Sequence, residues 1–318
     1  MSRIRLASRG SALALWQAEH VRQRLVAAHP GLEVVIEEVR TTGDRVTGVP
    51  LARIGGHGLF TREVDRAVMA GAADAAVHSL KDLPTTPEDG TTIAAVLARE
   101  DPADALVVAP TRARTLADLP AGAKVGTSSL RRRAQLLHRR PDVYVEDLRG
   151  NLDTRLRRVA EGHFDAVILA LAGIRRLGRE HDVAARLDPR DWLPAAGQGA
   201  LAVSVRGDDA ETERLVAALD DPATRLHTRL ERTVLSALEG GCQVPIGVLA
   251  TSPDATSIEV RAFVGSLDGT RFLTAQASAP REEAEALAAR LVRSLRDDGA
   301  GEILDAIRGE EAPETQAP

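Results

Sequence analysis

The sequence has very little cysteine, few aromatic residues and no long apolar run. Its 318 residues include one cysteine, Cys242, which excludes an internal disulfide bond and a multi-cysteine metal site and fits a reducing compartment. Aromatic residues make up 2 % of the chain, which leaves few platforms for stacking single-stranded bases. The first ten residues contain no apolar run of signal-peptide length, and no stretch approaches about 18 apolar residues. We therefore expect a cytoplasmic protein that binds neither membranes nor nucleic acid.

Lysine is scarce as well, and the charge is unevenly distributed. Lys81 and Lys124 are the only lysines among 41 basic residues, and the formal net charge is −5. Residues 124–176 nevertheless contain twelve basic and six acidic residues. A basic segment in an acidic protein indicates a local site for an anionic ligand. The length predicts two or three domains.

Strand-like and helix-like stretches alternate over the first 200 residues. An example is "RIRLAS" followed by the amphipathic "SALALWQAEHVRQRLVAA". This order is typical of α/β domains with mostly parallel sheets. Two stretches, 98–105 and 193–200, indicate connections between domains. After residue 207 we expect a helix that ends at Gly240 and Gly241, three strands and a further helix, which together form a smaller α+β domain.

Polar residues follow the predicted strands at the point where each strand ends. In open α/β sheets ligands bind beyond these carboxyl ends, where helix N-termini favour anions and arginine grips carboxylates in a two-pronged way. The pattern predicts a cleft for a ligand with several carboxylates. The residues that carry it are Arg9, Ser11, Lys81, Asp82, Thr127, Ser128, Ser129, Arg131, Arg132, Arg149, Arg155 and Arg176.

Each of these residues also has a plainer interpretation. Arginine-rich helices usually display solvated faces, Asp82 precedes Leu-Pro as turn residues do, and a lone cysteine is more often buried and inert. The recurrence of the same chemistry at the end of strand after strand favours a site. The eight histidines show no metal-ligand spacing and the chain has no phosphate-loop motif, so we expect neither a metal nor a nucleotide.

Several of these stretches together resemble the porphobilinogen deaminase family, also called hydroxymethylbilane synthases. The similarity runs in order from the first strand to the cysteine loop and is weaker after residue 250. The stretches that carry it are "LASRGSALALWQA", "GGHGLFTREVDRA", "DAAVHSLKDLPT", "REDPADALV", "VGTSSLRRRAQL", "DLRGNLDTRLRR", "ILALAGIRRLG", "LPAAGQGALAV" and "EGGCQVPIG".

The resemblance implies an enzyme of tetrapyrrole biosynthesis. In this family a dipyrromethane cofactor is attached by a thioether to the loop cysteine, which implies Cys242. Four porphobilinogen units are deaminated and joined to this primer, and hydrolysis releases hydroxymethylbilane. Asp82 would be the catalytic carboxylate, and Phe60 would lie close to the rings. The implied ligands of the cofactor and substrate are Arg9, Ser11, Gln17, Lys81, Ser129, Arg131, Arg132, Arg149, Arg155 and Arg176.

The resemblance also implies a monomer with three domains, of which the first two resemble periplasmic binding proteins around a cleft. The domains would span 1–99 with 200–217, 100–199 and 218–308. The tail at 309–318 is acidic and poor in apolar residues, so we expect it to be disordered. The family often has a lysine where this chain has His57, which would make the charge of that loop depend on pH near neutrality. A non-catalytic carboxylate-binding protein of the periplasmic type is the leading alternative, and a nucleic-acid-binding protein is a distant third.

Overall fold

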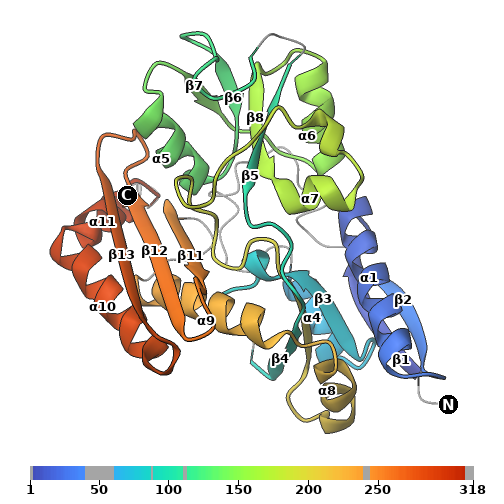
Figure 1. The fold of residues 1–318 in the computed structure, drawn as a ribbon. Helices are drawn as coiled ribbons and strands as arrows, with labels where there is room; N and C mark the ends of the chain where they lie inside the picture. Colours follow the sequence, from blue (N-terminus) through green and yellow to red (C-terminus); the bar gives the residue numbers. More distant parts are fainter. Residues whose placement is uncertain (1–2, 40–60, 87–88, 110–112, 239–243, 312–318) are drawn as a thin grey trace, which may run out of the picture.

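Three separate β-sheets, each with its own helices, form the framework of the molecule (Figure 1). The fold is given by a computed structural model that describes residues 3–39, 61–86, 89–109, 113–238 and 244–311. We call the sheets A, B and C; in Figure 1, sheet B lies at the top, sheet A at the lower right and sheet C at the left. The predicted α/β class, with two larger sheets and a smaller antiparallel one, is confirmed.

Sheet A has the strand order β2-β1-β3-β10-β4. Strands β1, β2 and β3 pair in parallel, whereas β10 runs antiparallel to both of its neighbours. Four of the five strands therefore point in one direction. The strands are β1 (Arg3–Arg9), β2 (Glu33–Val39), β3 (Ala75–Ser79), β4 (Thr91–Val96) and β10 (Leu201–Arg206).

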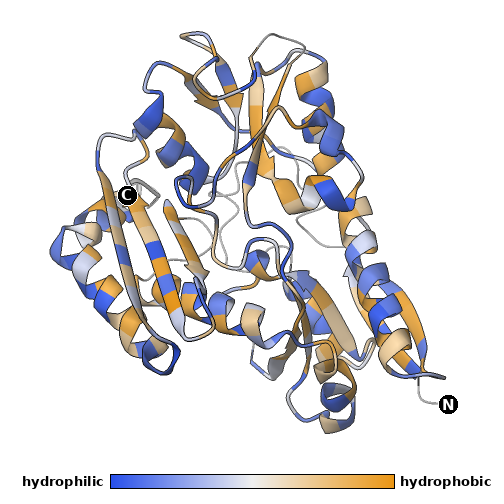
Figure 2. Ribbon diagram, in the orientation of Figure 1, coloured by the Kyte–Doolittle hydropathy of each residue, from blue (hydrophilic) through white to orange (hydrophobic). Residues whose placement is uncertain are grey.

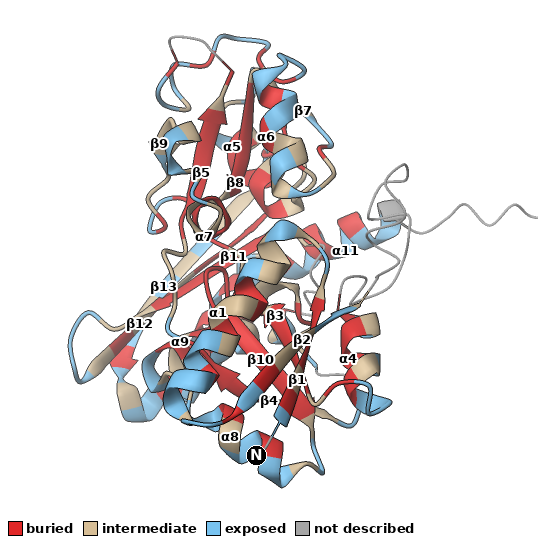
Figure 3. Cartoon of the chain, turned by 90° about the vertical axis from the view of Figure 1, so that its right-hand side faces the viewer, coloured by how far each residue is buried: buried red, intermediate tan, exposed pale blue. Residues whose placement is uncertain are grey.

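The two faces of sheet A are covered by different helices, because successive strand residues point to opposite sides. Leu6 packs in one cluster with Val21 of α1, while the next residue, Ala7, packs with Val64 and Val68 of α4. Figure 3 shows β3 and β10 as buried strands between these layers. The helices are α1 (Ala12–Ala28), α4 (Arg62–Met69) and α8 (Ala210–Ala217).

Sheet B repeats this plan in the order β7-β6-β8-β5-β9. Strand β5 is antiparallel to both neighbours, and the other pairings are parallel. Figure 2 shows β5 and β8 as largely apolar, whereas α5 and α6 carry hydrophilic turns. The elements are β5 (Asp104–Val108), β6 (Lys124–Gly126), β7 (Tyr144–Glu146), β8 (Ala166–Ala170), β9 (Ala185–Arg186), α5 (Leu130–Arg139), α6 (Leu152–Ala160) and α7 (Leu171–Arg176).

Sheet C is antiparallel, in the order β11-β12-β13. Its buried face packs on α9, α10 and α11 through apolar residues such as Val234, Val260 and Leu291. The elements are β11 (Ile246–Thr251), β12 (Ser257–Gly265), β13 (Phe272–Pro280), α9 (Pro222–Ala237), α10 (Ala284–Asp297) and α11 (Ala300–Glu311).

The two predicted connecting segments run side by side between sheets A and B. The backbone N–H of Glu100 in one segment donates to the carbonyl of Gly199 in the other, and Leu97 donates to Leu201 just beyond the two segments. Glu231 of α9, which is fully buried, accepts two hydrogen bonds from Arg99 at 2.6 and 3.0 Å. The three sheets therefore meet at this junction.

The structure corrects three details of the sequence analysis. Strand β5 begins at Asp104, so the segment 98–105 ends inside a strand that the sequence analysis did not predict. Helix α9 ends at Ala237, before the glycine pair, which lies outside the described residues. Helix α11 continues to Glu311, because Ile303 and Ile307 anchor its apolar face in the core. Residues 309–311 of the expected disordered tail are therefore helical.

Candidate functional site

A small cavity lies at the carboxyl ends of β1 and β3 and collects four of the predicted site residues. Its volume is about 70 Å³, and its lining includes Arg9, Ser11, Gln17 and Asp82. Ser11 caps α1 by accepting a hydrogen bond from the backbone N–H of Ala14 at 3.3 Å. The helix therefore begins at the rim of the cavity.

Gln17 is fixed by its neighbour across the cavity. The side chain is buried, and its Nε2 donates to the hydroxyl of Ser79 at 2.9 Å. Since Ser79 is the last residue of β3, this bond ties α1 to the strand that leads into Lys81 and Asp82. Both of these residues lie in one short helical turn, Leu80–Asp82.

Lys81 lies where charges from two sheets meet. Burial lowers its pKa to about 8; the carboxylates of Asp82 and Asp104 act against this shift, and Arg131 and Arg132 add to it. Lys81 is half-buried, and its Nζ donates to Oε1 of Gln198 at 3.3 Å. The site thus joins the end of β3 in sheet A to the first turn of α5 in sheet B.

Arg131 and Arg132 are buried at the start of α5, where Ser129 is the N-cap. Each donates to the fully buried carboxylate of Asp104 at 2.8 Å, and each also donates to a backbone carbonyl, of Leu193 and Ile168 respectively. Each arginine therefore uses two of its five N–H donors on these internal partners. Their Nε atoms are buried and have no hydrogen-bond partner within the described part of the chain.

Arg149 and Arg155 extend the cationic region beyond β7. Among the residues that the structure describes, Nε and Nη2 of Arg149 are buried without a hydrogen-bond partner, which is costly unless a ligand accepts from them. Arg155 donates from Nε to the carbonyl of Gly150 at 2.8 Å. Burial lowers its pKa to about 10; the charges of Arg132 and Arg149 lower it further, whereas Asp82 favours its charged form. Arg155 therefore lies among these three residues.

Arg176 contacts a different part of the site. Its Nη2 donates to the carbonyl of Gly199 at 2.7 Å, and its guanidinium lies 5.8 Å from the ring centroid of Trp16 in α1. Burial lowers its pKa to about 10, against the opposing charge of Glu100. Arg176 thus bridges α7, α1 and the second connecting segment.

Three residues to which the sequence analysis gave a functional role lie outside the described residues. They are Cys242, Phe60 and His57. The predictions that rest on them stay predictions.

The sequence analysis missed two buried polar residues that hold the site together, Asp104 and Gln198. Neither has any exposed surface. A carboxylate at the start of the apolar stretch "DALVV" and a glutamine in "PAAGQGA" are the signals in the sequence, since buried polar groups need partners. His78 is another buried residue of the cavity lining, and its Nε2 is bonded to Asp65 at 2.9 Å.

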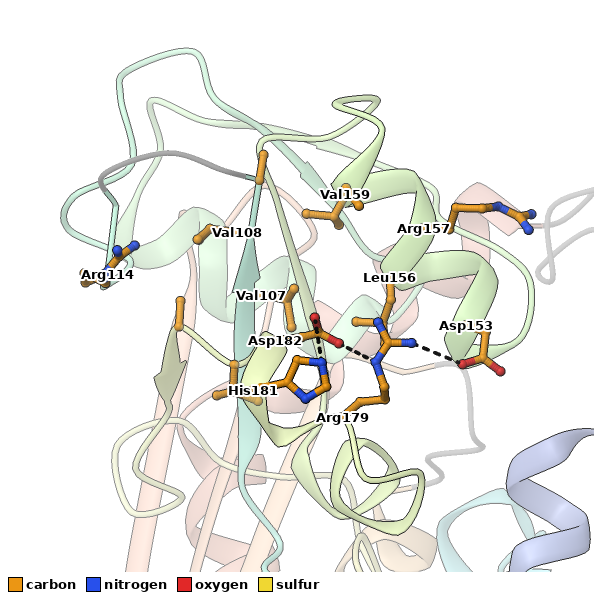
Figure 4. Close-up of a pocket in the computed structure, with 14 residues that line it drawn as sticks. Val107, Val108, Arg114, Asp153, Leu156, Arg157, Val159, Arg179, His181 and Asp182 are labelled. Atoms are coloured by element: carbon orange, nitrogen blue, oxygen red, sulfur yellow. Dashed lines mark hydrogen bonds and ion pairs between the residues drawn. The ribbon is translucent and has the colours of Figure 1, made fainter.

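A larger hollow of about 760 Å³ lies in sheet B away from these residues (Figure 4). Its lining combines Val107, Leu156 and Val159 with charged side chains. Arg179 there is already bonded to Asp182 at 2.7 Å and lies 3.8 Å from Asp153. None of the predicted site residues lines it, so it is a poorer candidate for the carboxylate site.

Among the described residues, no group of three histidine, cysteine or acidic side chains is placed to hold a metal ion. Within the same residues, no helix is both long and apolar enough to cross a membrane.

Two family models match this chain. The model "Porphobilinogen deaminase, dipyromethane cofactor binding domain" matches residues 4–214, and "Porphobilinogen deaminase, C-terminal domain" matches residues 226–297. The first model covers sheets A and B, and the second covers most of the unit built on sheet C.

Curated relatives match over nearly the whole chain. The porphobilinogen deaminase of Chromobacterium violaceum is 48 % identical over 98 % of this chain and 99 % of that protein. The porphobilinogen deaminase of Laribacter hongkongensis is 46 % identical over 97 % of this chain and 99 % of that protein. Among solved structures, the VFT2 domain of BvgS from Bordetella pertussis is similar with a TM-score of 0.42 and 17 % identity, covering 69 % of this chain and 85 % of that one.

Proposed function

The chain belongs to the porphobilinogen deaminase family, and we propose that Asp82 is the catalytic carboxylate with which it deaminates porphobilinogen. The enzyme is a transferase of tetrapyrrole biosynthesis that uses a dipyrromethane cofactor. It joins four porphobilinogen units head to tail and releases hydroxymethylbilane.

The observation that carries this proposal is the charge around Asp82. Its carboxylate favours the charged forms of both Lys81 and Arg155, while Arg132 opposes them. When the C–N bond of the substrate's aminomethyl group breaks, the electron pair leaves with nitrogen and the methylene carbon becomes cationic. The cations of the site cannot stabilise that charge. Asp82 can, because it presents a negative charge that is already in place before the carbon becomes cationic.

The arginines support binding of a ligand with several carboxylates. Buried nitrogens of Arg131, Arg132 and Arg149 have no acceptor among residues 3–39, 61–86, 89–109, 113–238 and 244–311, and carboxylate oxygens fit such donors. These residues, with Lys81, Arg9, Ser11, Ser129 and Arg155, would hold the acidic arms of the dipyrromethane attached to Cys242. The cofactor, when bound, supplies the pyrrole end to which the first substrate unit is added.

The remaining predicted contacts would bind the substrate. Arg9, Gln17, Arg149, Arg155 and Arg176 would orient its acetate and propionate groups, and Phe60 would lie against its ring. Arg9 and Gln17 line the same cavity as Asp82, which supports this assignment. The proposal includes a cytoplasmic monomer that acts without nucleic acid or a membrane, organised as the three domains defined above.

The experiment that tests this function is single-turnover ammonia release by Asp82→Asn supplied with preformed cofactor. Asparagine keeps the shape and removes the charge, so we expect a folded protein whose rate falls at least about a hundredfold, or about 2.7 kcal/mol of barrier. The exposed Asp89→Asn is the matched control and should keep its rate.

Three results would contradict the proposal. Retention of more than about a tenth of the normal rate would show that Asp82 is not the stabilising carboxylate. A parallel loss of thermal stability and rate would instead favour a structural role for Asp82 in its turn. A wild-type chain that binds porphobilinogen but releases no ammonia would favour the carboxylate-binding alternative.

A further inference from the structure

Gln198 lies between Lys81 and a buried carboxylate, and it contacts both. Its Oε1 accepts from Nζ of Lys81 at 3.3 Å, and its Nε2 donates to Oδ1 of Asp104 at 2.9 Å and to the carbonyl of Pro102 at 2.7 Å. The side chain has no exposed surface. One amide thus joins the two connecting segments to each other and to the end of β3.

The orientation of this amide is determined by its partners. A backbone carbonyl and an ionised carboxylate only accept hydrogen bonds, so the NH₂ group of Gln198 must face Pro102 and Asp104. The carbonyl oxygen is then directed at Lys81. A flipped amide would place its oxygen against the oxygens of Asp104 and Pro102 and its NH₂ group against an ammonium.

Asp104 is held in its acceptor state by the arginines of α5. Burial alone would raise its pKa, but the charges of Arg131 and Arg132 outweigh burial and keep the pKa well below its usual range. Its two oxygens accept from Arg131, Arg132, Gln198 and the indole N–H of Trp192. Asp104 therefore gives Gln198 a fixed partner that is ionised at neutral pH.

We propose that Gln198 is a positioning residue that holds the Lys81 ammonium beside Asp82 and makes its position depend on both connecting segments. This inference rests on the proposed function in one respect: the proposed function assigns Lys81 the role of binding an acidic group of the cofactor. The chain of contacts from the arginine pair through Asp104 and Gln198 to Lys81 links the cationic side of the site to the side that carries Asp82.

The proposal predicts how Lys81 titrates. Burial disfavours its charged form, Asp82 and Asp104 favour it, and Arg131 and Arg132 oppose it. A hydrogen bond accepted from the ammonium also favours the charged form. Removing the Gln198 acceptor should therefore lower the pKa of Lys81, so that it loses its charge at a lower pH.

The scarcity of lysine makes this measurement direct. In a holoenzyme labelled with ¹³C at lysine Cε, only Lys81 and Lys124 give side-chain signals. Lys124 is 45 % exposed and paired with Glu146, so it serves as an internal control. In Gln198→Met we expect the pKa of Lys81 to fall by about one unit, the effect of one charge-assisted hydrogen bond, while Lys124 is unchanged.

Gln135→Met is the matched control variant. Gln135 is equally buried and bonds to Leu193 through both groups of its amide, at 3.1 and 2.8 Å. The same loss of a buried amide should leave the Lys81 titration unchanged. If Gln198→Met does not fold, Gln198→Asn, which is one methylene too short to reach all three partners, should lower the Lys81 pKa in the same direction.

An unchanged Lys81 pKa in a folded Gln198 variant, or an equal fall in Gln135→Met, would overturn the proposal. The alkaline limb of kcat/KM should move to lower pH together with the Lys81 signal, and a limb that stays in place would also contradict it. A chain that releases no ammonia would remove the proposed function and would leave the lysine titration as an independent test.

Discussion

The ends of sheets A and B contribute opposite halves of the site. Sheet A supplies the catalytic candidate Asp82, with Ser11 and Gln17 in the same cavity, whereas sheet B supplies Arg131, Arg132, Arg149 and Arg155. The two sides also differ in how their charges are balanced. Asp104 already neutralises part of the charge of Arg131 and Arg132, while two nitrogens of Arg149 have no partner in the portion of the chain that the structure describes. Some of the arginine donors at the end of sheet B therefore have protein acceptors before any ligand binds. The remaining donors require a ligand that supplies hydrogen-bond acceptors, such as carboxylate oxygens.

The largest effect should come from preventing attachment of the dipyrromethane cofactor, which would contact residues of both sheet A and sheet B. In Cys242→Ala we expect complete loss of the covalent dipyrromethane and of activity, because no other thiol exists in the chain. Intact-mass measurement of the native protein should show an excess of two linked pyrrole units, and none in the variant. Cys242→Ser, which replaces the thiol with a hydroxyl of similar size, should also lack the adduct. An unmodified but fully active enzyme would refute this attachment.

The next largest effect should be a loss of stability when Asp104, the carboxylate that pairs with Arg131 and Arg132, is replaced. Asp104→Asn leaves two buried arginines without their carboxylate, which should reduce the free energy of unfolding by about 3–5 kcal/mol. Denaturant titration of the holoenzyme measures this loss. The exposed Asp297→Asn should change stability by less than about 0.5 kcal/mol. Equal small effects would show that Asp104 does not balance the arginines.

The same carboxylate gives a pH dependence of known sign. The pKa of Asp104 is lowered in the folded protein, so its stabilising contribution is fully present above the unfolded pKa of about 3.9 and is lost as pH falls from there through the lowered folded pKa. Asp104→Asn should flatten the fall in stability on the acid side. A curve as steep as that of the wild type would assign the acid sensitivity to other carboxylates.

A smaller effect is expected when the arginines proposed to bind the ligand, Arg149 and Arg155, are replaced. Arg149→Leu or Arg155→Leu should each remove a charge-assisted contact of about 1.5–3 kcal/mol, seen as a fall in kcat/KM of roughly 10- to 150-fold. Arg158→Leu is the matched control, since this exposed residue lies in the same helix as Arg155. Equal effects in all three variants would mean that the strand-end arginines are merely solvated.

The smallest effect is expected from replacing the serines that cap the helices, one next to sheet A and one next to sheet B. Ser11 and Ser129 cap α1 and α5, so replacing either with alanine should cost about 1 kcal/mol of stability, whereas glycine should cost only a few tenths. If the hydroxyls also bind carboxylates, the glycine variants should still raise KM. Thermal melts together with steady-state kinetics separate the two roles, and an unchanged KM would leave only capping.

The sequence predicted most of the elements and the shared edge where polar residues gather, because both follow from local periodicity and strand direction. Strand β5 was missed because "DALVV" is short and follows a proline-containing connection. Asp104 and Gln198 were missed for a different reason. Their hydrogen bond joins residues 94 positions apart, so it exists only once the two connecting segments lie together. Local patterns contain no information about such pairs.

The placement of β10 has a consequence for synthesis on the ribosome. This strand lies between β3 and β4 in sheet A, yet it follows the whole of sheet B in the chain. When residues 3–96 have emerged, β3 and β4 cannot pair with each other in the native way, since the strand that separates them has not been made. Strand β4 therefore stays without its native partner until about a hundred further residues have been translated, which takes about 5–20 seconds at roughly 5–20 residues per second. Sheet B can fold during that interval. Strand β10, which is synthesised after it, then pairs with β3 and β4 and completes sheet A.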